Sequence, residues 1–312
     1  IFAQDYVTLP ITSGFNVDVI AENRPAVNYT TTSIDYIGVN NTLLSLSLPG
    51  ATIGLPINGK INSQVNSTPF LPYQLKDYTT NNALKLTANN ISGTLQVTNS
   101  DNFSEIYILA TSGSGISTFS GRINFTDNTT QTINNITVFD WFDGGDYAIR
   151  GVGRINRYDD LIENANSNPR LYQIKIDIEV LNRNKTIQNI EFTKTNSDSN
   201  LSIFAITGKR PINCQQPTNL NATVLNTTTA TLSWTGANNI NNYDVKWGNP
   251  GFNFIADGNL ISNHNSNSLT ISNFTPNTEY EFYVRQSCGS LTGHSSWAGP
   301  FNFFIGYCIP VG

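Results

Sequence analysis

The chain has 312 residues, of which 12% are charged, and its formal net charge at pH 7 is −5. It contains 44 Asn and 35 Thr, so about a quarter of its side chains are neutral amides or hydroxyls, against 3 Cys and no Met. The length allows two domains with separate cores, and the lack of a basic cluster argues against nucleic acid as the main partner, because phosphate binding needs clustered cations.

Residues 1–210 contain short runs in which apolar and polar residues alternate, with Asn, Gly, Asp or Ser between the runs. This alternation predicts half-buried antiparallel strands, since β-branched side chains fit a pleated surface. The clearest runs are Phe15–Val19, Leu84–Leu86, Leu95–Val97, Ile106–Ala110, Ile123–Phe125, Ile174–Val180, Ile190–Phe192 and Ile203–Ala205. Helical turns are expected only around 159–164. About a dozen strands in one domain predict a jelly-roll-like β-sandwich of two sheets.

The same region carries an ordered series of short motifs. They are Gly54-Leu55-Pro56-x-x-Gly59-x-Ile61, Pro72-Tyr73-Gln74-Leu75, Asn82-Ala83-Leu84-Lys85-Leu86, Asp140-Trp141-Phe142 and Asn168-Pro169-Arg170-Leu171-Tyr172-Gln173. In this order they resemble a domain found in exported multidomain surface proteins of Bacteroidetes bacteria. The resemblance implies a galactose-binding-like jelly roll on a secreted or cell-surface protein that uses the type IX secretion route.

Aromatic and basic residues gather between positions 141 and 170, and this stretch is the best candidate for a binding surface. Sugar sites need an aromatic face for apolar C–H groups and planar donors for hydroxyls. The candidate ligand-binding residues are Trp141, Tyr147, Arg150, Arg154, Asn156, Arg157 and Arg170, and Tyr73, Tyr78 and Asn82 are candidates for the same rim. The competing interpretation places Trp141 and Phe142 in the core, with the arginines paired to Asp159, Asp160 and Glu163.

Three carboxylates, Asp140, Asp143 and Asp146, stand three residues apart around Gly144 and Gly145. A glycine-rich loop with this spacing is a candidate calcium site, because Ca²⁺ takes six to eight oxygen ligands. The alternative is a polar turn between strands in which Asp140 caps the following backbone through local hydrogen bonds.

Catalysis finds little support in the residue types. Both histidines, His264 and His294, lie in the last third of the chain, so the larger domain lacks the base of a Ser-His-Asp triad. Glycosidases use two facing carboxylates, and a pair such as Asp127 with Asp140 stays open. We expect no enzymatic activity from this chain.

A domain boundary is predicted at Lys209-Arg210-Pro211, followed by a second β domain over residues 211–305. The residues that carry its identity are Pro217-x-x-Leu220, Leu232-x-Trp234, Tyr243-x-Val245 and Thr275-Pro276-x-Thr278-x-Tyr280-x-Phe282-x-Val284. This set resembles the fibronectin type III family, an immunoglobulin-like β-sandwich. The resemblance implies that Trp234 fills the core and that the Tyr280 hydroxyl ties back to nearby backbone. Residues 306–312 are expected to be a linker or the start of a further domain.

All three cysteines, Cys214, Cys288 and Cys308, lie in the last third of the chain. Their spacing does not fit a metal site, because there is no C-x-x-C pair and no histidine at ligand spacing. We expect a disulfide between Cys214 and Cys288, which fits an oxidising compartment. Cys308 is then either free or paired outside the chain.

Together these features predict an all-β secreted or cell-surface protein without a transmembrane segment, since no apolar run approaches the roughly 20 residues of a spanning helix. Its expected work is non-catalytic binding or adhesion, with a glycan or a neighbouring surface protein as ligand. Two alternatives stay open. One is a structural subunit of a surface filament or adhesin stalk that self-associates, and the other is a pair of accessory domains on a secreted hydrolase.

Overall fold

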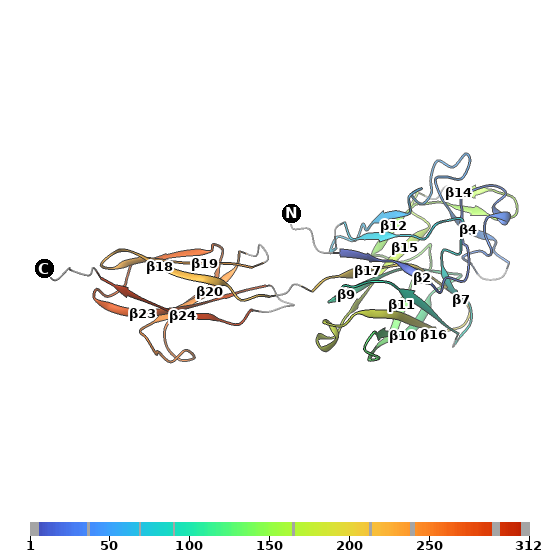
Figure 1. The fold of residues 1–312 in the computed structure, drawn as a ribbon. Coiled ribbons are helices and arrows are strands. Elements are labelled where there is room, and N and C mark those ends of the chain that lie inside the picture. The colour runs from blue at the N-terminus through green and yellow to red at the C-terminus, as the bar shows by residue number, and fades with distance from the viewer. Residues whose placement is uncertain are drawn as a thin grey trace. The chain divides into compact units, whose positions relative to one another are not determined.

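The computed structural model describes residues 6–35, 38–68, 70–89, 91–163, 166–211, 214–237, 241–288 and 294–306. The chain divides into two compact units, 1–211 and 212–312, one residue after the predicted boundary (Figure 1). The described part is built of strands and two single-turn 3-10 helices, η1 (Ala26–Asn28) and η2 (Val180–Asn182). No helix in this part is long and apolar enough to cross a bilayer.

Two antiparallel sheets form the body of the N-terminal unit. The six-stranded sheet has the order β1 (Tyr6–Leu9), β17 (Asn200–Lys209), β9 (Glu105–Gly113), β15 (Arg170–Asp177) and β12 (Tyr147–Arg150), and β7 (Leu84–Leu86) also pairs with β17. The five-stranded sheet has the order β11 (Thr130–Val138), β10 (Ser117–Phe125), β16 (Ile187–Lys194), β8 (Ser92–Val97) and β2 (Ile11–Ser13).

The connections between these strands are those of a jelly roll. One sheet contains the order β7-β17-β9-β15 and the other β8-β16-β10-β11. The chain crosses from one sheet to the other after β7, β8, β9, β11, β15 and β16, which is the double Greek-key path of a jelly roll. The predicted jelly-roll-like sandwich is therefore confirmed.

The core between the two sheets follows from the alternation seen in the sequence. Ile106, Ile108 and Ala110 of β9 point between the sheets, where they pack with residues such as Phe119 and Phe192. Since these strands are rich in β-branched and aromatic residues, the inner faces of both sheets bury a continuous apolar surface.

A third layer covers the opposite face of the six-stranded sheet, which the sequence pattern does not predict. Tyr107 and Leu109 of β9 point into a second apolar cluster with Leu43, Leu71 and Trp141. The layer contains a small sheet of β14 (Ile162–Glu163), β13 (Arg154–Asn156), β4 (Asn41–Leu44) and β3 (Ile20–Ala21), and a hairpin of β5 (Lys60–Asn62) and β6 (Pro72–Gln74). Figure 1 shows β4 and β14 on the side of this sheet away from β10 and β16.

The C-terminal unit is a smaller sandwich of two antiparallel sheets. One has the order β18 (Thr218–Asn226), β19 (Thr229–Thr235) and β22 (Ser268–Ile271), and the other β21 (Asn259–His264), β20 (Tyr243–Gly248), β23 (Thr278–Gln286) and β24 (Ala298–Ile305). Trp234 lies in the core between them, as predicted. The Tyr280 hydroxyl accepts a hydrogen bond from the Thr275 backbone N–H at 3.0 Å, which is the predicted corner contact.

The predicted disulfide between Cys214 and Cys288 is confirmed, with 5.6 Å between the two Cα atoms. It joins the entry of the C-terminal unit to the segment after β23. Cys308 lies outside the described residues.

Candidate functional site

The loop between β11 and β12, residues 139–146, is held in place from several directions. The two carboxylate oxygens of Asp140 accept hydrogen bonds from the backbone N–H groups of Phe142, at 3.0 Å, and Gly115, at 2.6 Å. The Tyr172 hydroxyl donates to the backbone carbonyls of Asp140, at 2.6 Å, and Asp143. Because these contacts come from β15 and from the β9–β10 turn, the loop has a fixed position against the sheet.

The structure does not gather Asp140, Asp143 and Asp146, the predicted calcium ligands, around one point. Both oxygens of Asp140 are occupied by backbone donors, while Asp143 and Asp146 are exposed. Among the described residues, which include all three aspartates, no group of three or more metal-ligating side chains could hold a metal ion. The alternative turn, with Asp140 as its cap, is the arrangement found.

Trp141 lies in the core and offers no face to a ligand, which corrects its predicted role. Its side chain is 1% exposed, and its indole N–H donates to the Asp35 carboxylate at 3.0 Å. The Phe142 ring packs edge-on against it, with ring centroids 5.6 Å apart. The competing interpretation of these two aromatics is therefore the one that the structure supports.

Two of the candidate arginines, Arg154 and Arg157, are engaged by other parts of the N-terminal unit. Arg154 pairs with Glu163, with 2.8 Å between Nε and the carboxylate, and its guanidinium lies 4.4 Å from the Phe142 ring centroid. Arg157 is buried and donates from Nε to the Thr30 hydroxyl and from Nη2 to the Thr30 carbonyl, both at 2.7 Å. These partners occupy the planar donors that a ligand would need.

Arg170 and Asn156 serve the same scaffold. Arg170 donates to the backbone carbonyls of Ser167, at 3.2 Å, and Gly144. The Asn156 side-chain oxygen accepts a hydrogen bond from the Tyr158 backbone N–H at 2.9 Å. Asn156 therefore stabilises a local turn, and Arg170 holds the loop 139–146 against the segment before β15.

The predicted rim residues Tyr73, Tyr78 and Asn82 are buried. The Tyr73 hydroxyl lies 3.3 Å from the side-chain oxygen of Gln173, and the Tyr78 hydroxyl donates to the Pro56 carbonyl at 2.7 Å. Asn82 accepts a hydrogen bond from the Val19 backbone N–H at 3.0 Å. None of the three reaches a shared rim.

Of the other candidate ligand-binding residues, Arg150 is exposed and Tyr147 is half-buried. They lie on β12, which is the edge strand of the six-stranded sheet. The Arg150 guanidinium is 4.8 Å from the Tyr147 ring centroid, and that of Arg170 is 5.8 Å from it. The structure thus brings an aromatic ring and an exposed cation together at one sheet edge.

A groove of about 570 Å³ opens beside this edge, and we call it the Tyr147 groove. On one side it is bounded by the loop 64–68, which reaches the edge strand through a hydrogen bond from the Gln64 N–H to the Ala148 carbonyl at 2.9 Å. The described residues that line it are Gln64, Val65, Asn66, Ser67, Thr68, Tyr107, Asp146, Tyr147, Gln173 and Lys175. Amides, hydroxyls, two tyrosine side chains, one carboxylate and one ammonium therefore converge on a single groove.

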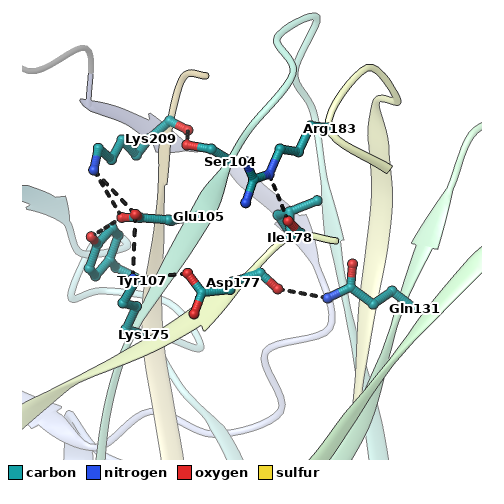
Figure 2. A network of polar contacts seen from close by, with 9 residues as sticks. All are labelled: Ser104, Glu105, Tyr107, Gln131, Lys175, Asp177, Ile178, Arg183 and Lys209. Atoms are coloured by element: carbon teal, nitrogen blue, oxygen red, sulfur yellow. Dashed lines mark hydrogen bonds and ion pairs between the residues drawn. The ribbon is translucent and has the colours of Figure 1, made fainter. Parts of the chain in front are cut away.

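A network of charges, drawn in Figure 2, shares Tyr107 and Lys175 with the lining of the groove. Glu105 on β9 is 2% exposed and accepts a hydrogen bond from the Tyr107 hydroxyl. Its carboxylate pairs with the Lys209 ammonium at 3.2 Å and with the Lys175 ammonium at 3.4 Å. Asp177 holds Lys175 as well, at 2.9 Å. Lys175 is thereby fixed at the groove with its side chain 44% exposed.

Burial would raise the pKa of Glu105, but the Tyr107 hydrogen bond and the two ammonium groups outweigh it and hold that pKa below its usual range. Burial, together with the Glu105 carboxylate, raises the pKa of Tyr107. Glu105 is thus kept anionic and Tyr107 neutral. This network was not predicted, although Glu105, a charged residue directly before the apolar run Ile106–Ala110, was a signal for it.

Comparisons with known proteins concern the C-terminal unit most directly. Residues 215–301 match the family model described as Fibronectin type III domain. No curated protein matches the chain.

Three solved structures that are similar to this chain have low TM-scores. The FN5 domain of Drosophila Lar has 18% identity and a TM-score of 0.26, covering 31% of this chain and 100% of that one. The chicken CNTN1 FN1–FN3 domains have 14% identity and a TM-score of 0.30, covering 71% of this chain and 62% of that one. The glycoside hydrolase domain of Endo-D from Streptococcus pneumoniae has 14% identity and a TM-score of 0.25, covering 75% of this chain and 35% of that one. These scores are too low to bear on activity or ligand.

The family match, the two-sheet core around Trp234 and the Tyr280 corner agree with one another. Such a domain, together with the disulfide, fits a multidomain binding or linker protein of the extracellular type. The C-terminal unit, over residues 215–301, is a fibronectin type III domain.

Proposed function

We propose that the N-terminal unit is a non-catalytic glycan-binding module of a secreted or cell-surface protein, and that its ligand lies in the Tyr147 groove. The observation that carries the proposal is the joint presence of an aromatic ring and of polar groups around one hollow. In this arrangement the fibronectin type III domain serves as a spacer or adhesive unit.

The chemistry of the groove suits a sugar better than an apolar ligand. A pyranose ring presents C–H groups that pack against an aromatic ring, here Tyr147 beside the Arg150 and Arg170 guanidinium groups, and hydroxyls that need hydrogen-bond partners. Asn66 and Ser67 are exposed at the groove and supply neutral donors and acceptors, and the Asp146 carboxylate accepts hydrogen bonds from hydroxyls. Lys175 adds a charged donor that is already oriented by Glu105 and Asp177.

The size of the groove supports a small ligand. Sites for small molecules span about 300–1,000 Å³, and the groove, at about 570 Å³, lies within that range. A protein partner would instead be expected to need a broad surface of about 800 Å² on each side. Glycan binding is therefore favoured over recognition of a neighbouring surface protein.

The charges around the groove favour binding without chemistry. Among the described residues that line it, Asp146 alone carries a carboxylate. Glu105 is buried, with its oxygens engaged by Tyr107, Lys175 and Lys209. A glycosidase needs a second free carboxylate facing the first across the scissile bond.

A glycan array tests the proposal with three proteins: the wild type, Tyr147→Ala and the matched control Tyr158→Ala. Tyr158 is 66% exposed and does not line the groove. We expect binding to a defined set of sugars by the wild type and the control, and at least about a tenfold loss for Tyr147→Ala, since one stacking contact contributes on the order of 1.4 kcal/mol. An array without signal, or equal binding by all three proteins, would overturn the proposal.

A further inference from the structure

The strand β11 forms one edge of the five-stranded sheet and lacks the residues that commonly protect such an edge. Within the described part of the chain it pairs with β10 alone. Residues 128–139, which contain the whole strand, include no charged residue and no proline. Natural edge strands commonly carry such residues, because these block pairing with another chain.

The sequence of this strand is self-complementary. Residues 132–137 are Thr-Ile-Asn-Asn-Ile-Thr, which is the same in both directions. If two copies pair antiparallel about an axis between Asn134 and Asn135, Thr132 of one copy faces Thr137 of the other. Ile133 then faces Ile136, and the two central asparagines face each other. Every cross-strand pair joins identical residue types, and no like charges meet.

The backbone makes the burial pattern symmetric as well. A β-bulge between Phe119 and Gly121 places Asn134 and Asn135 together opposite Ser120. Asn135 has a φ of 43°, and its N–H donates to the Ser120 hydroxyl at 3.2 Å.

Because of the bulge, Ile133 and Ile136 both pack against the sandwich core although they are three residues apart. Thr132, Thr137 and the two asparagines are exposed. A bulge often turns an edge strand away from new partners, but this one lies at the centre of the palindrome and preserves its symmetry.

We propose that the chain forms a symmetric dimer in which β11 pairs antiparallel with β11 of a second copy. A two-fold axis normal to the sheet joins the two five-stranded sheets and keeps the apolar face of each copy on the same side. A closed two-fold interface requires a surface that complements itself, which the palindrome supplies. One pair of short strands buries less than the about 1,200 Å² of a stable complex, so the dimer is weak and concentration-dependent.

Sedimentation velocity on the full chain over a wide range of concentrations tests this proposal. Thr132→Glu with Thr137→Glu places glutamates opposite each other at both ends of the strand pair, and we expect the dimer dissociation constant to rise at least about tenfold. Thr132→Glu with Thr137→Lys places each new glutamate opposite a new lysine across the axis. This second variant should restore dimerisation to near the wild-type level.

A matched control adds the same charge at the other edge of the sheet, through Ser13→Glu on β2 with Thr98→Glu after β8. It should dimerise as the wild type does, and equal melting temperatures show that all variants are folded. The proposal is overturned by a wild type that stays monomeric at all concentrations. It is equally overturned by a dimer that survives the glutamate pair or that the Glu/Lys pair does not restore. The glycan array does not depend on this edge, so the two proposals can fail separately.

Discussion

At the scale of single residues, Glu105 is the buried charge of the network that shares Tyr107 and Lys175 with the Tyr147 groove. Its carboxylate is withdrawn from water and is compensated by Lys175, Lys209 and the Tyr107 hydroxyl. A compensated buried charge adds little net stability, whereas removal of one partner leaves a charge uncompensated. Glu105, together with Asp177, therefore orients Lys175 at the groove.

Glu105→Gln should lower the free energy of unfolding at pH 7, because the Lys209 and Lys175 ammonium groups both lose their pair with Glu105 and Lys175 keeps only Asp177. The pKa of Glu105 is lowered in the folded state, so its contribution is present above the unfolded pKa of about 4.3 and is lost as the pH falls through the folded pKa. The difference between wild type and variant should be largest near neutrality and should shrink below about pH 4. Urea denaturation at pH 7 and pH 3 measures the free energies of unfolding of wild type and variant, and hence their difference at each pH.

The control for this experiment is Glu191→Gln, which removes an exposed pair with Arg122 at 3.0 Å. Such surface pairs contribute about 0–1 kcal/mol, so this variant should change stability little at either pH. If Glu105→Gln lowers the free energy of unfolding equally at pH 3 and pH 7, the residue stabilises the unit through its shape and not through its charge.

At the scale of elements, the disulfide is the main cross-link of the fibronectin type III domain. It joins Cys214 to Cys288 over a sequence separation of 74 residues. In the chain-entropy account a loop of this length stabilises the folded state by about 4 kcal/mol. The first 213 residues contain no cysteine, so the effect should be confined to the C-terminal unit.

Calorimetry with and without a reductant tests this confinement. We expect two transitions, of which reduction shifts the one of the C-terminal unit down by several degrees and leaves the other in place. The variant Cys214→Ser with Cys288→Ser should show the lowered transition temperature of the C-terminal unit without reductant, and reductant should not lower it further. A shift of both transitions, or of neither, would contradict a stabilising effect of the disulfide that is confined to the C-terminal unit.

Edge strands decide where each sheet can bind or pair. β12 ends the six-stranded sheet beside the Tyr147 groove, where the loop 64–68 partly covers it. β11 ends the other sheet and is not covered in this way within the described residues. The two proposals therefore concern different edges of the jelly roll, one for a ligand and one for a second copy.

At the scale of the whole molecule, the fold class was predictable because it rests on local patterns. Alternating apolar residues identified the central strands of the jelly roll, such as β9, β16 and β17, but not edge strands such as β11 and β12, and the predicted run Phe15–Val19 contains only an isolated bridge at Val17. The motif around Tyr280 identified the fibronectin type III domain. The third layer was not predictable, since its strands are two to four residues long and show almost no periodicity. The Bacteroidetes origin, the type IX route and the galactose-binding-like relationship stay predictions.

The candidate site was only partly predictable. Tyr147 was selected by residue type and lies at the groove. Trp141 and Arg157 were selected on the same grounds but are buried. Sequence neighbourhood does not show which of these side chains face inward. The other half of the groove, at 64–68, is distant from Tyr147 in sequence and reaches it only through the pairing of strands.

Hydrogen-exchange mass spectrometry of the full chain, with and without a saturating concentration of a sugar selected on the array, tests whether a glycan binds in the Tyr147 groove. We expect protection in the peptides that cover 64–68 and 144–150, with the fibronectin type III domain unchanged. Protection confined to residues 215–301, or to parts of the N-terminal unit remote from β12, would contradict binding in this groove.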